Sequence, residues 1–340
     1  MKGDVINVKV VVIGAGTMGS VHAEAYASMP GVELRGIVDP RLDVAQSLAE
    51  KLGSFSYSTL DSLLMAEDPD VVDVCVPTPF HKEYIVRAAK AGKHIISEKP
   101  LDRNLSDAED SIRVCKEHNV RLFVGQVVRF FPEYRSIRQQ IVQGKLGQVG
   151  TARTFRGGSF PSGSNDWYAN SKLSGTIIVD LLIHDIDFLR WCFGDVERVY
   201  AKNLVAERNR LDHAYVSLKF QNGVIAHLEG TWSAPSGFST AIEVAGDKGL
   251  ITHNSDGSVP IHSAIRQQRS GVAAVEVPSS PMIHNPYFIE LEHFIHCIRT
   301  GDVADVEPED ALAALKISLA AVRSAQSGEV VTLSQARGEK

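Results

Sequence analysis

A chain of 340 residues with 44% hydrophobic and 22% charged residues has the composition of a globular protein, and its length predicts two domains. The net charge of −6 argues against a nucleic-acid-binding surface, and the scattered basic residues over 129–145 are expected on a solvated helix face. No apolar run is as long as a membrane span, and the N-terminal residues do not resemble a signal peptide. The four cysteines lack the spacing of zinc or disulfide sites, so we expect buried thiols in the cytoplasm.

The first predicted elements are a strand, a glycine-rich turn, a helix and a second strand. Residues 10–13 are apolar and β-branched, as in a strand buried on both faces of a parallel sheet. The turn GAGTMG follows at 14–19, a helix is predicted over 20–28, and a strand over 32–38 ends at Asp39. Together these elements form the context that a dinucleotide-binding fingerprint requires.

Each part of this fingerprint has a physical role in holding a dinucleotide. Gly14 makes the tight turn, Gly16 lets the backbone approach a pyrophosphate, and Gly19 lets the helix pack close to the strand. The pyrophosphate is expected at the helix N-terminus, at Thr17 and Met18, where free N–H groups and the helix dipole favour an anion.

The acidic residue after the second strand bears on the choice of cofactor. Asp39 lies 20 residues after Gly19 and is placed to accept hydrogen bonds from the adenosine ribose hydroxyls. Because its charge would repel a 2′-phosphate, we expect NAD in preference to NADP. Arg41 is either a group that stacks on adenine or reaches a 2′-phosphate, or an ordinary surface charge, so NADP stays possible.

Helices are predicted next over 40–52, 61–65, 81–91 and from 104 or 106 to 118, with strands over 71–76, 94–97 and 120–124. The strand over 71–76 ends at Pro77, and that over 94–97 is followed by Glu98 and Lys99, at the sheet edge where open α/β sheets bind ligands. Lys99 is either a hydrogen-bond donor to a substrate oxygen or a surface lysine. The predicted domains are residues 1–124 and 125–340.

The second half of the chain changes character. Helices are predicted over 132–143 and 176–193, and strands over 151–155, 199–205, 214–220, 224–232, 240–245 and 250–253. Asn222 and Gly223 between two alternating runs predict a hairpin, and the run of strands predicts an antiparallel sheet. Helices over 286–299 and 308–327 finish the chain, and the histidines of the first are interpreted as part of amphipathic packing.

The predicted helix over 176–193 holds polar residues inside an apolar stretch. Spacings of four and three residues put Asp180, His184 and Asp187 on one face. A carboxylate one turn from an imidazole can hold its tautomer and stabilise its cation, which predicts acid–base catalysis. The alternatives are a half-exposed helix with scattered polar residues, and a metal site, for which the sequence supplies no obvious third ligand.

Several motifs together resemble the glucose–fructose oxidoreductase/inositol dehydrogenase (Gfo/Idh/MocA) family. They span nearly the whole chain: GAGTMG at 14, PTPFH at 77, EKP at 98, VVRFFPEY after 126, SGTIIVDLLIHDIDFLRWCFGD at 174 and FQNG at 220. The resemblance implies an N-terminal α/β Rossmann domain and a C-terminal α+β domain with an open-faced antiparallel sheet. It also implies an NAD(P)-dependent dehydrogenase of a sugar, inositol or polyol, assembled as a homodimer or homotetramer through that sheet.

The resemblance also implies roles for single residues. The catalytic residues by motif are Lys99, Asp180 and His184, which also touch the substrate. The cofactor's nicotinamide end is expected to meet the residues Pro77, Thr78, His81, Glu98, Lys99 and Gln126. Arg156, Trp167 and Tyr168 fall at positions where the family often contacts its substrate, which is a weaker basis than a matching motif. One departure is visible, since the family often has two glycines where this chain has Gly175 and Thr176, which puts the shape of the substrate pocket in doubt.

The reaction expected from these residues is reversible hydride transfer without a metal. His184 takes the proton from a secondary hydroxyl, Asp180 orients His184, and Lys99 positions the hydroxyl. The hydride passes to nicotinamide C4. Two alternatives remain: a non-catalytic nucleotide-sensing protein on the same fold, and an enzyme that keeps its nicotinamide bound and passes hydride between two sugars.

Overall fold

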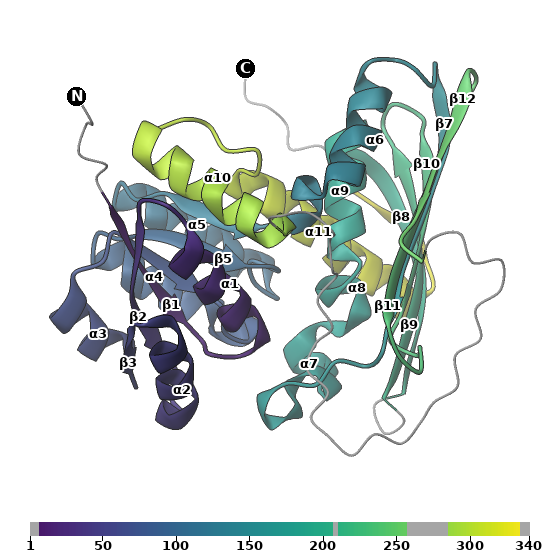
Figure 1. Ribbon diagram of the computed structural model, residues 1–340. Helices are drawn as coiled ribbons and strands as arrows, with labels where there is room; N and C mark the ends of the chain where they lie inside the picture. The colour runs from purple at the N-terminus through teal and green to yellow at the C-terminus, as the bar shows by residue number, and fades with distance from the viewer. Residues whose placement is uncertain (1–6, 207–209, 257–284, 334–340) are drawn as a thin grey trace. The chain divides into compact units, whose positions relative to one another are not determined.

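The computed structural model describes residues 7–206, 210–256 and 285–333 (Figure 1). The chain divides into two compact units, each made from two separate stretches of sequence. The first unit holds Met1–Phe130 and Ser279–Leu312, and the second holds Phe131–Pro278 and Ala313–Lys340. Helix α11 (Pro308–Ser327) carries the chain from the first unit into the second.

A six-stranded parallel sheet forms the first unit, with the strand order β3-β2-β1-β4-β5-β6. Its strands are β1 (Val8–Ile13), β2 (Val32–Val38), β3 (Phe55–Tyr57), β4 (Val71–Val74), β5 (His94–Glu98) and β6 (Leu122–Gly125). The helices between them are α1 (Thr17–Ser28), α2 (Leu42–Leu52), α3 (Leu60–Glu67), α4 (His81–Lys90) and α5 (Leu105–Glu117). This arrangement confirms the predicted Rossmann domain, while the short edge strand β3 was not predicted.

The boundary between the units differs from the predicted division after residue 124. Helix α10 (Pro286–Thr300) belongs to the first unit, although it follows the strands of the second unit in the chain. Its apolar side chains join the core around α1 and β1, and Phe294 stacks on Phe123 with ring centroids 5.0 Å apart. Arg129 was expected on a solvated face, but its guanidinium is buried and donates to the Asp305 carbonyl oxygen. Burial of apolar surface, rather than chain order, therefore assigns α10 to the first unit.

A seven-stranded sheet forms the second unit, with the strand order β12-β11-β7-β10-β9-β8-β13. Its strands are β7 (Val149–Gly158), β8 (Val196–Ala206), β9 (Leu211–Phe220), β10 (Ile225–Thr231), β11 (Phe238–Gly246), β12 (Gly249–Asn254) and β13 (Val331–Thr332). The pair β7 and β10 is parallel, and the other neighbours are antiparallel, so the predicted antiparallel sheet is a mixed one. The predicted hairpin at Asn222 and Gly223 joins β9 to β10, with Gly223 at a φ of 96°.

Helices cover one face of this mixed sheet. They are α6 (Pro132–Val142), α8 (Thr176–Asp180) and α9 (Ile183–Phe193), which Figure 1 shows along the same side, while the short α7 (Ser171–Ser174) precedes α8. Side chains alternate along β9, where Ala214, Val216 and Leu218 are buried and Tyr215 is exposed. The alternation puts the hydrophobic core between the sheet and these helices.

The other face of the mixed sheet carries both apolar and charged side chains. The strand registers put on this face the exposed hydrophobic residues Tyr200, Leu204, Tyr215, Ile225 and Leu250. Charged residues lie among them, namely Arg153, Lys202, Lys219, Glu229 and Glu243. The outer face of the sheet is therefore a mixed apolar and charged surface.

The cysteines bear on the chemistry and location of the protein, and the lengths of the helices on whether one of them could span a membrane. All four cysteines are free; Cys115 and Cys297 are buried, while Cys75 and Cys192 are partly exposed. Each helix in the described part of the chain is too short or too polar to cross a lipid bilayer.

Candidate active site and family

The glycine-rich turn between β1 and α1 leaves no room for side chains at two positions. A Cβ on Gly14, whose φ is 101°, would lie 2.3 Å from the Cys75 carbonyl oxygen, and one on Gly19 would lie 1.8 Å from the Gly14 oxygen. A Cβ on Gly16 would meet nothing within 4 Å. The turn is therefore closed on the side of the sheet and open at Gly16. Because Thr17 begins α1, free N–H groups of a helix N-terminus lie at this opening, which fits a pyrophosphate.

Asp39 follows β2 and is buried against the same turn. Its Oδ2 atom accepts a hydrogen bond from the Ala15 main-chain N–H at 3.0 Å. Both of its oxygens also accept from the Arg41 guanidinium, each at 3.0 Å. Burial raises the pKa of Asp39, but the hydrogen bonds from Arg41 and Ala15 outweigh it and leave the pKa below its usual value. The carboxylate is thus held ionised, and Arg41 is bound to it rather than directed away from it.

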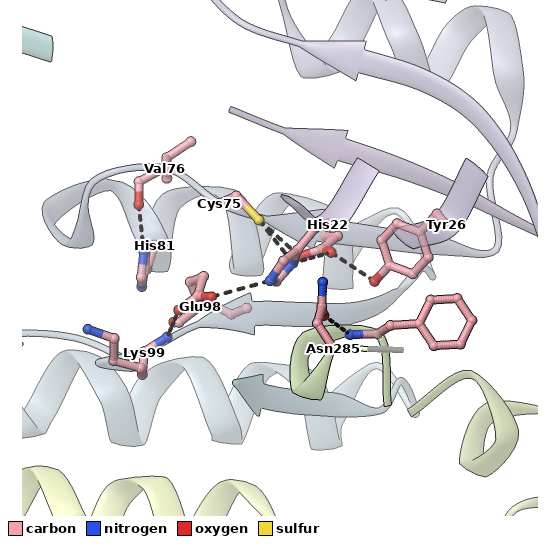
Figure 2. Close-up of polar contacts among 11 residues, drawn as sticks. His22, Tyr26, Cys75, Val76, His81, Glu98, Lys99 and Asn285 are labelled. Atoms are coloured by element: carbon pink, nitrogen blue, oxygen red, sulfur yellow. Dashed lines mark hydrogen bonds and ion pairs between the residues drawn. The ribbon is translucent and has the colours of Figure 1, made fainter. Parts of the chain in front are cut away.

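His81 braces two loops at the carboxyl edge of the parallel sheet. Its Nε2 lies 2.8 Å from the Val76 carbonyl oxygen after β4 (Figure 2). Its Nδ1 lies 2.9 Å from the Pro100 carbonyl oxygen after β5. Burial lowers the pKa of His81. The neutral ring has one N–H, so it donates to one of these carbonyl oxygens and lies against the other, between the loop of Pro77 and the loop of Lys99.

The turn after β5 carries the predicted lysine. Glu98 is the last residue of β5, and its Oε2 accepts a hydrogen bond from the Lys99 main-chain N–H at 3.0 Å. The other oxygen, Oε1, lies 3.3 Å from Nε2 of His22 on α1. Sequence reasoning missed His22, although a signal was present, since Asp73 inside the apolar run VVDVCV needs a buried partner.

Two further residues at this edge are buried. Thr78 follows Pro77 and is 2% exposed, and Gln126 follows β6 and is fully buried. Neither polar atom of the Gln126 amide has a hydrogen-bond partner within the described residues. A buried amide left with both groups unmatched is costly, so it marks a place for a polar ligand group. With the open Gly16 turn and the ionised Asp39, these residues fit a nicotinamide dinucleotide.

Asp180 and His184 do not share one continuous helix, which corrects the predicted helix over 176–193. Helix α8 ends at Asp180 and α9 begins at Ile183. At the break, the Leu182 main-chain N–H bonds to the Ile177 oxygen, five residues back instead of four. Leu182 also packs on Gly230 of β10, where an added Cβ would lie 2.8 Å from its side chain. The two predicted catalytic residues therefore flank a discontinuity fixed by packing on the sheet.

Asp212 of β9 is a carboxylate beside this helix that sequence reasoning missed. Its Oδ2 accepts a hydrogen bond from the Ile177 main-chain N–H at 2.7 Å, while its Oδ1 is buried without a hydrogen-bond partner in the described chain. Burial and the charge of Asp180 raise the pKa of Asp212 to about 7. Thr176, which stands where the family often has a second glycine, directly precedes Ile177. Its φ is 69°, a conformation that costs a β-branched residue about 1–2 kcal/mol.

The residues expected to touch substrate lie in different settings. Arg156 of β7 is buried and binds Asp185 of α9 through two hydrogen bonds, of 2.7 Å and 3.2 Å. Trp167 and Tyr168 lie on a short 3₁₀ segment (Ser164–Ala169), half-buried, with ring centroids 4.0 Å apart. Asp187 is fully buried on α9. The structure therefore gives Arg156 a clear packing role, in addition to any role toward substrate.

The sequence matches known proteins over nearly its whole length. Residues 8–126 match the model of an oxidoreductase family with an NAD-binding Rossmann fold, and residues 138–333 match the C-terminal alpha/beta domain of the same family. The chain is 30% identical to a myo-inositol 2-dehydrogenase of Thermotoga maritima, over 97% of this chain and 100% of the relative. It is 29% identical to an NAD(+) scyllo-inositol 2-dehydrogenase of Bacillus subtilis, over 96% of each chain.

A solved structure agrees with this placement. The crystal structure of GenD2 from gentamicin A biosynthesis, in complex with NAD, superposes with a TM-score of 0.86 at 26% identity and covers 97% of each chain. Both domain models match in order and together span most of the sequence. The chain therefore belongs to the Gfo/Idh/MocA family of oxidoreductases, whose N-terminal domain is an NAD-binding Rossmann fold.

Proposed function

We propose that the protein oxidises a secondary hydroxyl group of an inositol or a closely related cyclic polyol, with NAD as the hydride acceptor. The observation that carries the proposal is the presence of Lys99, Asp180 and His184 in a chain that aligns end to end with two inositol dehydrogenases. A nucleotide-sensing protein on this fold would have no use for a lysine, a carboxylate and an imidazole at these three motif positions.

Each of the three residues has a distinct task in this proposal. His184 accepts the proton of the hydroxyl group as it is oxidised, and Asp180 orients the imidazole. Lys99 donates a hydrogen bond to the reacting oxygen and stabilises the negative charge that develops on it. When bound, NAD supplies the electrophilic C4 of nicotinamide, which accepts the hydride.

The cofactor would be held by residues of the first unit. The open turn at Gly16 and the start of α1 would bind the pyrophosphate, and the ionised Asp39 would bind the adenosine ribose. The unmatched amide of Gln126 would meet the nicotinamide end, together with Thr78. His81 would act by holding the two loops that it already braces.

Substrate contacts in the second unit form a further part of the proposal. Trp167 and Tyr168 offer stacked aromatic rings, one indole N–H and one hydroxyl, which suit the mixed polar and apolar faces of a cyclic polyol. Arg156 would act through Asp185, by holding α9 against β7. Thr176 would give this enzyme a pocket shape that a glycine at the same position would not.

The proposal extends to assembly and location. We infer a homodimer or homotetramer joined through the outer face of the mixed sheet, because exposed Tyr215 and Ile225 lie on its neighbouring inner strands β9 and β10. Arg153 and Glu243 on the same face already form an ion pair within the chain, 3.8 Å apart, so the apolar residues carry the proposed contact. A cytoplasmic location suits an NAD-dependent enzyme with four free cysteines.

A substrate screen tests the proposed activity. Purified protein would be mixed with NAD and, in turn, myo-inositol, scyllo-inositol, other inositols, aldoses and sugar acids, while absorbance at 340 nm reports NADH. We expect the highest kcat/KM with an inositol. Turnover of aldoses alone would overturn the substrate assignment, and NADH binding without any turnover would favour the nucleotide-sensing alternative. NADH absorbance in the protein as purified would identify an enzyme that retains its cofactor.

A further inference from the structure

A chain of buried polar contacts links helix α1 to the turn that carries Lys99. His22 lies one turn beyond Gly19 and is fully buried. Its Nδ1 is 2.8 Å from Oδ2 of Asp73 in β4, and its Nε2 is 3.3 Å from Oε1 of Glu98. Figure 2 shows the ring with Glu98 to its left, Cys75 above it and Tyr26 to its right. The imidazole thus bridges two carboxylates on neighbouring strands.

The two contacts of this ring differ in kind. The 2.8 Å contact of Nδ1 with Asp73 is a hydrogen bond, whereas the 3.3 Å contact of Nε2 with Glu98 lacks hydrogen-bond geometry and is an ion pair. Because both neighbours are carboxylates, they favour the protonated, cationic form of the ring. Burial lowers the pKa of His22, but Cys75 and Asp73 more than offset this and raise it well above the usual value. Burial likewise raises the pKa of Glu98, but the His22 cation and Lys99 bring it below the usual value. His22 is therefore an imidazolium between two carboxylates.

The groups around the ring support this arrangement. The Tyr26 hydroxyl donates to the same Asp73 oxygen at 2.8 Å, and the Cys75 thiol donates to the other at 3.4 Å. Burial raises the pKa of Cys75 far above its usual value, so Cys75 is a neutral thiol. Helix α10 contributes Tyr287, whose ring centroid is 6.4 Å from that of His22, and the buried Glu290, whose charge acts on Tyr26.

A metal ion would be an alternative occupant, since ligand atoms of His22, Asp73 and Cys75 lie within 4.8 Å of one another. Two ligands of a tetrahedral zinc ion, with bonds of about 2.0–2.1 Å, lie roughly 3.3 Å apart. The 2.8 Å between Nδ1 and Oδ2 is instead the length of a charge-assisted hydrogen bond. The described geometry therefore favours a hydrogen-bonded network over a metal site.

We propose that His22 is a positioning residue for the proposed reaction, and that it fixes the turn of Lys99 by holding the Glu98 carboxylate in place. The inference rests on the proposed catalytic role of Lys99. The Glu98 carboxylate in turn holds the main chain at Lys99, because its second oxygen accepts a hydrogen bond from the Lys99 N–H. Since α1 begins at the proposed pyrophosphate site, one helix holds both the cofactor turn and the lysine turn.

The first test measures the turn directly and needs no substrate. Amide hydrogen exchange at Lys99 would be compared in the wild type, in His22→Gln, which keeps a polar side chain but loses the charge, and in Cys115→Ala. The alanine control removes a buried thiol from α5, outside the contacts of His22 and Glu98. We expect exchange at Lys99 to be at least tenfold faster in His22→Gln and unchanged in Cys115→Ala. Unchanged exchange at Lys99 in His22→Gln would overturn the proposal.

The second test is kinetic, with myo-inositol and NAD as the probes. We expect kcat to fall by about 10- to 100-fold in His22→Gln while the NADH dissociation constant stays within about threefold, because α1 itself is retained. Without the cation, burial raises the pKa of Glu98, so the variant should lose further activity toward acidic pH. Adding Glu98→Gln should remove that new acid limb. A pH profile parallel to that of the wild type would contradict a positioning role through Glu98.

Folding and function are separated by two further measurements. If His22→Gln does not fold, Asp73→Asn takes its place, since it weakens the network at the far end and leaves Glu98 and Lys99 intact; unchanged Lys99 exchange there would equally overturn the proposal. If the wild type oxidises no polyol, the proposed function fails, while amide exchange at Lys99 still decides whether His22 holds the turn.

Discussion

The Ile177 main-chain N–H donates a 2.7 Å hydrogen bond to Oδ2 of Asp212, which ties the first turn of α8 to strand β9. The bond supplies an acceptor for one of the free N–H groups at a helix start, a task usually done by a residue next in the chain. It also holds a carboxylate near Asp180 in a buried place, which raises the pKa of Asp212 to about 7. The anchor of α8 is therefore sensitive to pH.

The first prediction is that Asp212 makes stability fall as pH rises from 5 to 8. The unfolded carboxyl loses its proton near pH 4 and the folded one near pH 7, so ionisation favours the unfolded chain over this interval. The loss should amount to roughly 2 to 3 kcal/mol. Asp212→Asn keeps an acceptor for Ile177 and should remove this part of the pH dependence. Urea unfolding at pH 5 and pH 8 measures the free energy of unfolding of the wild type and of Asp212→Asn. If that free energy changed equally with pH in both proteins, the raised pKa of Asp212 would be contradicted.

The second prediction concerns His184. His184→Asn keeps a polar side chain but cannot accept the hydroxyl proton, so turnover should fall by roughly 10²- to 10⁴-fold. NADH binding should barely change, because the proposed cofactor residues lie in the other unit. The oxidation rate of the wild type should rise with pH as His184 loses its proton, and this limb should vanish in the variant. Near-wild-type turnover, with a deuterium isotope effect showing that chemistry is rate-limiting, would place the base elsewhere.

Local sequence signals were enough for the dinucleotide-binding turn of the first unit. A buried apolar strand, the glycine turn and Asp39 follow one another within about thirty residues, so their arrangement depends on short-range geometry. The turn at Lys99 was predictable for the same reason. His22 was missed because its partners, Asp73 and Glu98, come from two strands far along the chain.

Tertiary packing decided the features that sequence reasoning got wrong or missed. The apolar stretch around Asp180 carries no breaking residue, and the helix is interrupted where Leu182 packs on Gly230. Asp212 shares the face of Ala214 and Val216 in β9, so the alternation puts this carboxylate on the buried side of the strand, where the Ile177 N–H of α8 meets it. Helix α10 follows the mixed sheet in the chain but packs on the parallel one. In each case the partner is distant in sequence.

The third prediction concerns cofactor choice. Arg41 is bound by the carboxylate of Asp39, so removing that carboxylate both ends the repulsion of a 2′-phosphate and releases the guanidinium toward it. Asp39→Ser should shift the ratio of kcat/KM for NAD and NADP toward NADP by at least about tenfold. Arg41→Ala serves as the control and should keep the preference for NAD, while the double variant should lose most of the gain. A wild type that prefers NADP would refute this role of Asp39.

The fourth prediction concerns the outer face of the mixed sheet. Ile225 is 42% exposed on β10, and the register places it beside Lys219, on the face that also holds Tyr215. If this face joins two copies, Ile225→Glu would replace apolar contact area by a carboxylate beside Lys219, and desolvating both charges in the interface would cost more free energy than their pairing returns. Light scattering at micromolar concentration should give a dimer or tetramer for the wild type and a smaller species for the variant. Val142→Glu, at a residue that is 65% exposed on helix α6, is the control and should keep the wild-type mass. A monomeric wild type would rule out the assembly, and an Ile225→Glu variant of unchanged mass would place the interface on another face.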